Sequence, residues 1–319
     1  MDNYINQPFD LSEIFFITTA NTLDTIPPAL KDRMEIIEFS SYIEEEKLQI
    51  AKKYLLPKEM NNNGITAKNI HISDSAVIEI IRYYVREAGV RGLQRNIATV
   101  MRKIARKVAD GDTTKYSITP QNIRDFLGRR KFLHELAGRK SEIGIVTGMA
   151  WTSFGGEILF CESNKMLGKG NLILTGLLGE VMQESAKIAL SYIKANYAKY
   201  NINIEIFEKN DIHIHLPTGS VPKEGPSAGV TLTTSILSLL LEKPVKHDIA
   251  MTGEITLYGN ILPVGGIKEK VLAAKRANIK TVLIPLQNQD SYDEIPDDVK
   301  KDLNVVFVTH IDEILEIVL

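Results

Sequence analysis

The chain has 319 residues, of which 44% are hydrophobic and 24% are charged, and this composition excludes intrinsic disorder and fibrous repeats as descriptions of the whole. Thirty-eight basic and 40 acidic residues give a formal net charge of -2, so charge alone does not indicate a nucleic-acid-binding protein. The single cysteine, Cys161, cannot form an internal disulfide or a cysteine-rich zinc site, which is typical of a reducing compartment.

No segment predicts a membrane span or a signal peptide. The longest uncharged stretch, residues 225–241, contains three serines and three threonines and predicts a buried helix instead. The N-terminal sequence MDNYINQPFD has neither a basic start nor an apolar run. We therefore expect a cytoplasmic protein that does not interact with membranes.

The N-terminal segment is typical of the end of an α/β domain. Residues 14–19, IFFITT, form a short apolar and β-branched run that predicts a strand buried on both faces of a parallel sheet. Residues 34–39, MEIIEF, predict a second such strand. These strands need neighbours, and no comparable run precedes them. We interpret residues 1–40 as the C-terminal remnant of an α/β core that begins outside this chain.

Residues 41–137 predict a small domain of four helices. Helical periodicity and capping residues place them at residues 43–56, from Ser73 to about residue 89, at 93–108 and at 119–128. The third helix carries a basic outer face, which we interpret as solvated; it consists of Arg102, Lys103, Arg106 and Lys107. The polar residues 129–142 predict a linker.

Residues 138–319 predict one compact domain in which strands and helices are mixed. We expect strands at residues 143–147, 157–161, 171–175, 211–216, 248–256, 281–285 and 305–308. We expect helices at residues 179–200, 225–241, 267–277 and 311–318. The fold class of the whole chain is therefore α+β, with a helical domain followed by a mixed α/β domain.

Ser227 is a candidate nucleophile because of its place in the sequence. A Gly-Pro pair leads straight into an apolar helix and puts Pro226 in the first turn, where proline is favoured. Ser227 then lies beside the unpaired N–H groups of a helix start, which stabilise negative charge. A serine whose attack creates an oxyanion needs such surroundings. A helix-capping serine explains the same local pattern equally well.

A serine nucleophile needs a base, and the sequence offers three candidates. His213 and His215 lie on one face of a predicted strand, and apolar residues take the other. A His-x-His pair can bind a metal, but no third ligand stands at a convincing spacing, so a polar structural network is the better interpretation. The third candidate lies in the segment GGIKEK at residues 265–270.

Helical geometry separates the two lysines of that segment. Lys270 projects about 60° from Ile267, at the edge of the apolar face, and Lys268 projects about 100° to the other side, on the charged flank. Burial disfavours an ammonium ion and lowers the pKa of a lysine, which leaves a neutral amine able to take a serine proton. A lysine that only covers apolar surface with its stem is the alternative for Lys270.

Three motifs together resemble the proteolytic domain of the Lon family of ATP-dependent proteases. They are PKEGPSAG at residues 222–229, MTGEIT at 251–256 and GGIKEK at 265–270. The resemblance implies a serine endopeptidase in which Ser227 is the nucleophile and Lys270 the general base. Their separation of 43 positions (270 − 227) matches the family's catalytic pair.

The same resemblance implies roles for residues around the pair. Thr252 matches a hydroxyl that helps to orient the lysine, and His213 and His215 match positions held near the site for structure. Glu224 stands where the family often has aspartate, and its extra methylene could alter how this loop opens or blocks the site. Peptide hydrolysis of this kind needs no metal or organic cofactor.

Residues before the proteolytic domain resemble parts of an AAA+ ATPase. Thr19-Ala20-Asn21 is similar to a sensor-1 strand end, which implies that Asn21 senses the γ-phosphate. The segment PALKDRME at residues 28–35 resembles an arginine-finger segment and offers Arg33 to a neighbouring subunit's nucleotide. The segment REAGVRGL at 86–93 resembles sensor 2, with Arg91 facing the subunit's own nucleotide. The helical domain is then the AAA+ lid, and the finger implies a homo-oligomer, a hexameric ring in the full-length parent.

One departure from the family limits what this chain can do. No G-x-x-x-x-G-K-[ST] phosphate loop occurs in the sequence, so we expect no ATP hydrolysis by this chain and assign MgATP to the full-length parent. The expected function is hydrolysis of unfolded or damaged proteins in protein quality control. The alternatives are an ATP-independent Ser–Lys protease, or a non-catalytic AAA+ lid that serves as a chaperone or contacts DNA.

Overall fold

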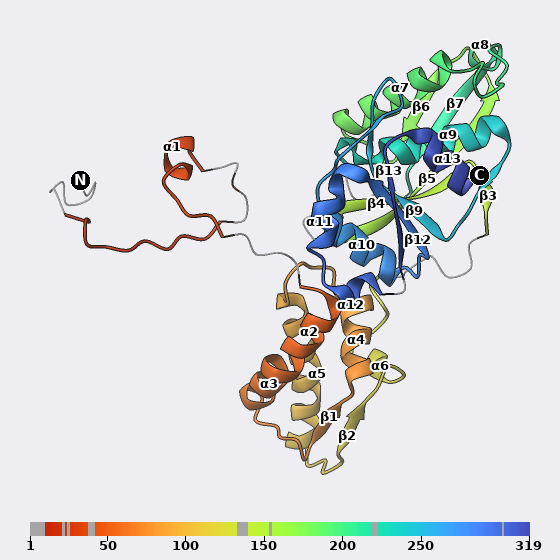
Figure 1. Ribbon diagram of the computed structural model, residues 1–319. Helices are drawn as coiled ribbons and strands as arrows, with labels where there is room; N and C mark the ends of the chain where they lie inside the picture. Colours follow the sequence, from red (N-terminus) through yellow and green to blue (C-terminus); the bar gives the residue numbers. More distant parts are fainter. Residues whose placement is uncertain are drawn as a thin grey trace. The chain divides into compact units, whose positions relative to one another are not determined.

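The computed structural model describes residues 10–20, 23, 26–37, 42–132, 140–152, 155–217, 223–301 and 303–319. Contacts between residues divide the chain into two units, residues 1–40 and 41–319. The second unit contains a helical part followed by a part built on one large sheet (Figure 1). Within the described ranges, no helix combines the length and the apolarity that a membrane crossing requires.

The first unit holds one short helix, α1 (Pro28–Lys31), and no strand among its described residues. The predicted strand at residues 14–19 is wrong, because these residues form no ladder and Phe15 and Ile17 are 87% and 82% exposed. The predicted strand at 34–39 is also absent over residues 34–37, and its last two residues lie outside the described ranges. A strand is held by hydrogen bonds to a neighbouring strand, and no described residue pairs with either run.

One continuous helical segment begins the second unit. It consists of α2 (Glu44–Ile50), the π-helical turn η1 (Ala51–Leu55) and α3 (Leu56–Asn62). It therefore runs past the predicted end at residue 56, although Pro57 lies within it. In a regular α-helix the proline ring would clash with the carbonyl four residues earlier, and the wider π turn before Pro57 makes room for it.

The rest of the helical part consists of β1 (Ile70–Ile72), α4 (Asp74–Tyr83), α5 (Arg91–Ala109), β2 (Tyr116–Ile118) and α6 (Ile123–Leu127). Ser73 caps α4 as predicted, since its hydroxyl accepts a hydrogen bond from the Ala76 N–H at 3.2 Å. The parallel pair of β1 and β2 has no counterpart among the predicted elements, because three-residue strands show no readable periodicity. The helices enclose an apolar core that includes Ile80, Leu93, Ile97 and Ile104.

Two predicted helix boundaries in this part are wrong, the end of α4 and the start of α6. Helix α4 stops at Tyr83 instead of near residue 89, and the hydroxyl of the next residue, Tyr84, donates to the Gly128 carbonyl at 2.9 Å. Helix α6 begins at Ile123 instead of residue 119. The reason is a local turn, in which the side-chain oxygen of Asn122 accepts from the Thr119 N–H at 2.8 Å.

The second part is built on a seven-stranded sheet in the order β13-β12-β9-β4-β5-β7-β6. Its strands are β4 (Ile145–Thr152), β5 (Gly155–Leu167), β6 (Leu172–Thr175), β7 (Asn210–His215), β9 (Ile249–Met251), β12 (Thr281–Pro285) and β13 (Asn304–Val308). Strand β5 is antiparallel to both of its neighbours, and all other pairs are parallel. Two short pairs lie apart from it: β3 (Glu142–Ile143) with β8 (Pro244–Val245), and β10 (Glu254–Ile255) with β11 (Ile261–Leu262).

Helices cover both faces of this sheet (Figure 1). They are α7 (Glu180–Ala195), α8 (Ile206–Lys209), η2 (Pro226–Ala228), α9 (Gly229–Leu241), α10 (Ile267–Arg276), η3 (Leu286–Asn288), α11 (Gln289–Asp293), α12 (Asp297–Lys300) and α13 (Ile311–Val318). Alternate residues of β12 show the two layers, because Leu283 packs in a core with α7, α9 and α13, whereas Val282 and Ile284 pack in a core with α10. Residues 41–319 are therefore a helical part followed by a mixed α/β sheet part, which confirms the α+β fold class predicted for them.

Two long elements predicted for this part are shorter than expected. The helix expected over residues 179–200 ends at Ala195, where the Asn196 side chain donates to the Tyr192 carbonyl at 2.9 Å. The strand expected over 248–256 is broken, since β9 ends at Met251 and the chain turns before β10. That break is made by Thr252 and Gly253, which belong to the candidate site.

Candidate functional site

Ser227 lies in a single 3-10 turn, η2, that leads into helix α9. The turn begins at Gly225, whose φ of 102° is strained for a residue with a side chain. Pro226 follows in the first turn, as predicted. Helix α9 is buried along almost its whole length, so the partly exposed Ser227 stands where a buried helix reaches the surface.

The carbonyl of Ser227 is held by the residues that interrupt the predicted strand. It accepts hydrogen bonds from Thr252 Oγ1 at 3.1 Å and from the Gly253 N–H at 3.0 Å. In return, the Gly253 carbonyl accepts from the Val230 N–H at 3.1 Å. The turn that carries Ser227 is therefore fixed to the end of β9. Thr252 has no exposed surface; its hydroxyl binds the serine turn, and its N–H donates to the Leu283 carbonyl at 3.1 Å.

Lys270 lies on α10 with only 2% of its surface exposed, whereas Lys268 is partly exposed. This is the difference that the helical projection predicts. Removal of the ammonium from water lowers the pKa of Lys270 to about 8, and the neighbouring carboxylate of Glu269 opposes part of that fall. At pH 7 a minor fraction of Lys270, on the order of a tenth, is therefore a neutral amine, and this fraction rises with pH.

Gly156 lies against the backbone of α10 beside Lys270 and is a site residue that the sequence motifs do not include. A Cβ at Gly156 would lie 1.8 Å from the Glu269 carbonyl oxygen and 3.0 Å from the backbone nitrogen of Lys270, so strand β5 touches the backbone of α10 there. Only glycine permits this approach. The one sequence signal for it is the glycine pair at residues 155 and 156.

The register of the sheet brings Ser227 and Lys270 to the same end. Strands β9 and β4 are parallel neighbours, with Met251 opposite Gly148. Ser227 is bonded to the two residues that follow Met251, and Lys270 abuts Gly156 beside the last residues of β4. Within the described structure the Ser227 hydroxyl and the Lys270 amine do not form a hydrogen bond. In structures without substrate, catalytic hydrogen bonds are often long and tighten only in the complex.

His213 and His215 belong to a polar structural pair on β7. Both rings bind the hydroxyl of Thr175 on the neighbouring strand β6, with distances of 2.9 Å to Nε2 of His213 and 2.7 Å to Nδ1 of His215. Across the described ranges no group of three His, Cys, Asp or Glu side chains could hold a metal ion. The two rings therefore tie the outer strands of the sheet together.

Glu224 joins the serine loop to helix α7. Its carboxylate accepts a hydrogen bond from the Val181 N–H at 3.0 Å, which places negative charge at the helix start. Gly179 leaves space for this carboxylate, because a Cβ there would lie 1.3 Å from Glu224 Oε2. Sequence spacing gives no sign of this contact, which joins positions 43 residues apart.

The three residues expected to act on nucleotide are not all described. Asn21 lies outside the described residues. Arg33 is exposed just after α1 in the first unit. Arg91 is the first residue of α5 in the second unit and is exposed at the rim of a hollow that Glu59, Gln94, Arg95 and Ala98 also line.

The chain is similar to known proteins over its whole length. Residues 117–319 match the family described as the Lon protease (S16) C-terminal proteolytic domain, and residues 61–117 match the Lon protease AAA+ ATPase lid domain. Lon proteases of Dictyoglomus thermophilum, Geobacter metallireducens and Koribacter versatilis are 52%, 53% and 54% identical to this chain. These matches cover 100% of the chain and 40%, 39% and 39% of the relatives, so the chain spans about two fifths of their length. The chain belongs to the Lon protease family and carries its AAA+ lid and its serine-protease domain.

Proposed function

We propose that this chain cleaves peptide bonds of unfolded or damaged proteins through a dyad of Ser227 and Lys270. The observation that carries the proposal is the burial of Lys270, which keeps its pKa at about 8, at the end of the sheet where Ser227 leaves a buried helix. Neutral amine and nucleophilic hydroxyl are the two groups that acyl transfer requires.

The reaction follows from these groups. Neutral Lys270 takes the proton of the Ser227 hydroxyl, and Oγ attacks the peptide carbonyl to form a tetrahedral intermediate. Backbone N–H groups around Ser227, at the start of the helix, stabilise the oxyanion. The Lys270 ammonium then protonates the leaving amine, and water attacks the acyl-enzyme with Lys270 again as base.

Three neighbouring residues support the dyad in this proposal. Thr252 fixes the serine turn through the Ser227 carbonyl, and we retain from the family resemblance that it also orients the lysine. Glu224 anchors the serine loop on α7. His213 and His215 keep the outer strands in register through Thr175.

Nucleotide plays no part in this chain's own chemistry. The sequence contains no phosphate loop, so its residues do not fit productive binding of MgATP. We propose that a full-length parent acts in the cytoplasm as a hexameric ring that uses MgATP to unfold substrates. Asn21, Arg33 and Arg91 would serve that step.

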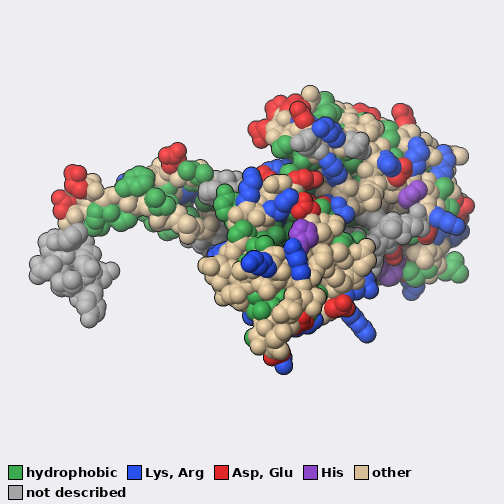
Figure 2. Space-filling model, turned by 90° about the horizontal axis from the view of Figure 1, so that it is seen from below, with side chains coloured by type: hydrophobic (Ala, Val, Ile, Leu, Met, Phe, Trp, Pro, Cys, Tyr) green, Lys and Arg blue, Asp and Glu red, His purple; other side chains and the backbone are tan. Residues whose placement is uncertain are grey.

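A non-catalytic role in DNA binding is less well supported. The basic residues of α5 are partly engaged within the lid, where Lys107 Nζ lies 4.6 Å from the centre of the Tyr116 ring and Arg106 pairs with Asp110. The face shown in Figure 2 carries basic and acidic side chains interspersed. DNA-binding surfaces instead concentrate basic residues.

Cleavage of an unstructured fluorogenic peptide tests the proposal. The chain should cleave it slowly, ATP should not accelerate the reaction, and a chelator should not stop it. Ser227→Ala should remove activity, while Ser191→Ala, which changes an exposed serine bonded only within α7, should not. A Ser227→Ala variant as active as the unaltered chain would refute the assignment.

A further inference from the structure

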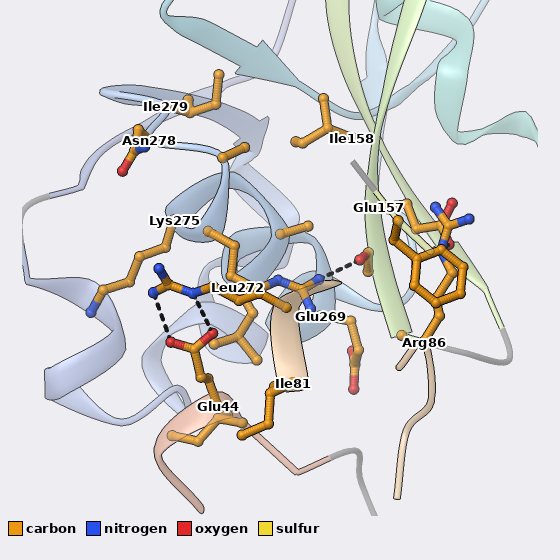
Figure 3. Close-up of a pocket in the computed structure, with 18 of the residues that line it drawn as sticks. Glu44, Ile81, Arg86, Glu157, Ile158, Glu269, Leu272, Lys275, Asn278 and Ile279 are labelled. Carbon is orange, nitrogen blue, oxygen red and sulfur yellow. Dashed lines mark hydrogen bonds and ion pairs between the residues drawn. The ribbon is translucent and has the colours of Figure 1, made fainter. Parts of the chain in front are cut away.

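The lid and the proteolytic domain meet at a cavity of about 640 Å³ in the second unit. Glu44 of α2 and Ile81 of α4 line it from the lid, and Leu272 and Lys275 of α10 line it from the other part (Figure 3). Charged residues from both parts surround this space, including Lys47, Arg86, Glu157 and Arg276. Helix α10, which lines this cavity, also carries Lys270.

One ion pair crosses from the lid to strand β5. Arg86 Nε lies 2.6 Å from Glu157 Oε1, and Figure 3 shows the two side chains together beside the start of β5. The Arg86 guanidinium also lies 5.6 Å from the centre of the Phe132 ring. The carboxylate of Glu157 is largely covered, with 21% of its side chain exposed.

Glu157 is the direct neighbour of Gly156, the residue that touches the backbone of α10 at Lys270. The Gly156 carbonyl is bound from the far end of the same helix, where Arg276 donates to it at 2.6 Å. Gly156 is thus held on one side by α10 itself and on the other through Glu157 by the lid. A displacement of the β5 backbone at Glu157 would move Gly156 relative to the helix that carries the lysine.

The lid segment that supplies Arg86 is itself fixed at several points. Glu87 accepts hydrogen bonds from the N–H groups of Gly92 and Leu93 at 2.6 and 2.7 Å, which caps the start of α5. The Glu87 carbonyl accepts from the buried amine of Lys47. Arg86 therefore projects from a rigid corner of the lid, five residues before Arg91.

We propose that Arg86 is a positioning residue for peptide hydrolysis: through its ion pair with Glu157 it holds Gly156 against α10, and so keeps Lys270 out of water and in place. The proposal rests on the function proposed above for Lys270. It assigns the lid a role in the peptidase site that needs no nucleotide. Among charged groups, Glu269 acts directly on Lys270, so the ion pair acts on the lysine by packing and not by charge.

The test compares variants of the whole chain. Arg86→Ala, Glu157→Ala, the double variant and the exchanged pair Arg86→Glu with Glu157→Arg are assayed with an unstructured fluorogenic peptide. Lys52→Ala and Lys165→Ala are matched controls, because each breaks an ion pair of 2.7 or 2.8 Å in the lid or in β5 away from the cavity. The titration midpoint of Lys270 is measured separately from its ¹³Cε signal in lysine-labelled protein, with Lys270→Ala to assign the signal.

Both single variants and the double variant should lower kcat by about the same three- to tenfold, with KM nearly unchanged. The midpoint of Lys270 should rise toward that of a free lysine as water reaches the amine. The exchanged pair should return kcat and the Lys270 midpoint most of the way to those of the unaltered chain. The two control variants should change neither quantity.

Unchanged kcat and midpoint in Arg86→Ala would overturn the inference. So would equal losses in the two controls, or a folded exchanged pair that recovers nothing. An unaltered chain without peptidase activity would refute the proposed function instead, and the shift of the Lys270 midpoint would still decide whether Arg86 positions the lysine.

Discussion

Lys270 is held almost completely out of water on α10, and this burial fixes its chemistry. With a pKa of about 8, it can accept a proton from Ser227 near neutral pH and return one to the leaving amine. Lys268, two positions away, is partly exposed on the other flank of the helix. The proposed roles of the two lysines therefore differ because two residues along an α-helix turn the side chain by about 200°.

Substitution of each lysine should show this difference. Lys270→Ala should lower peptide cleavage by orders of magnitude, because the serine loses its proton acceptor. Lys270→Arg should be almost as damaging, since a guanidinium stays protonated across the usable pH range. Lys268→Ala should cost little. Turnover of one peptide by all four proteins checks the assignment, which fails if Lys268→Ala is as inactive as Lys270→Ala.

Burial of Lys270 should also cost stability, with a defined pH dependence. The folded-state pKa of about 8 lies below the ordinary 10.5, so the unfolded chain binds more protons between these values and stability rises with pH there. Lys270→Met should stabilise the chain by on the order of 2–3 kcal/mol below pH 8, and the gain should vanish above about pH 10.5. Thermal unfolding at pH 7 and pH 10 measures it. An equal effect at both pH values would contradict the burial of a charged amine.

At the scale of elements, the site is the junction of two helices with the ends of neighbouring strands. Helix α9 brings Ser227 from one face of the sheet and α10 brings Lys270 from the other. A close approach of β5 to the backbone of α10 at Gly156 makes the junction possible, and Gly253 leaves room for the side chains of Ile261 and Val230. The chemistry therefore depends on two positions that carry no reactive group.

Gly156→Ala should expose that dependence. The new Cβ would overlap the Glu269 carbonyl oxygen, which belongs to rigid backbone, so β5 and α10 must separate. We expect cleavage to fall by about tenfold or more and the thermal midpoint to drop by several degrees. Gly265→Ala is the steric control, because a Cβ there meets no atom within 4 Å. Wild-type activity in folded Gly156→Ala would show that this contact does not place the lysine.

The helices of the site could be predicted from the sequence, and its turns could not. Helix α10 follows from the apolar spacing from Ile267 onward, and α9 from its Gly-Pro start. The break after Met251 escapes prediction because Thr252 and Gly253 bond to a turn 25 residues earlier. The strand predicted at residues 14–19 is wrong for a different reason, since an apolar run forms a strand only where another strand pairs with it.

At the scale of the molecule, the residues proposed for peptide hydrolysis are separate from those proposed for nucleotide chemistry. Peptide cleavage is assigned to residues of the sheet domain, with Arg86 of the lid as the positioning contact. The residues assigned to nucleotide, Asn21, Arg33 and Arg91, have no proposed step in this chain.

Arg33→Ala and Arg91→Ala test this separation. Each should leave peptide cleavage by this chain within about twofold, since both residues are proposed to act on nucleotide, and each should abolish ATP turnover when placed in the full-length parent. Peptide assays of this chain and ATPase assays of the parent measure the two effects. Loss of peptide cleavage in a folded variant would show that the division of roles is wrong.

The most direct test of the Ser–Lys assignment is the pH dependence of kcat/KM for an unstructured peptide between about pH 6 and 10. The account predicts a rate that rises with pH through an apparent pKa of about 8, as Lys270 loses its proton. Replacement of His213 or His215 should leave this midpoint in place. A midpoint near the ordinary histidine value of about 6.5 that moves or disappears in the His213 or His215 variants would contradict the account and make a histidine the base.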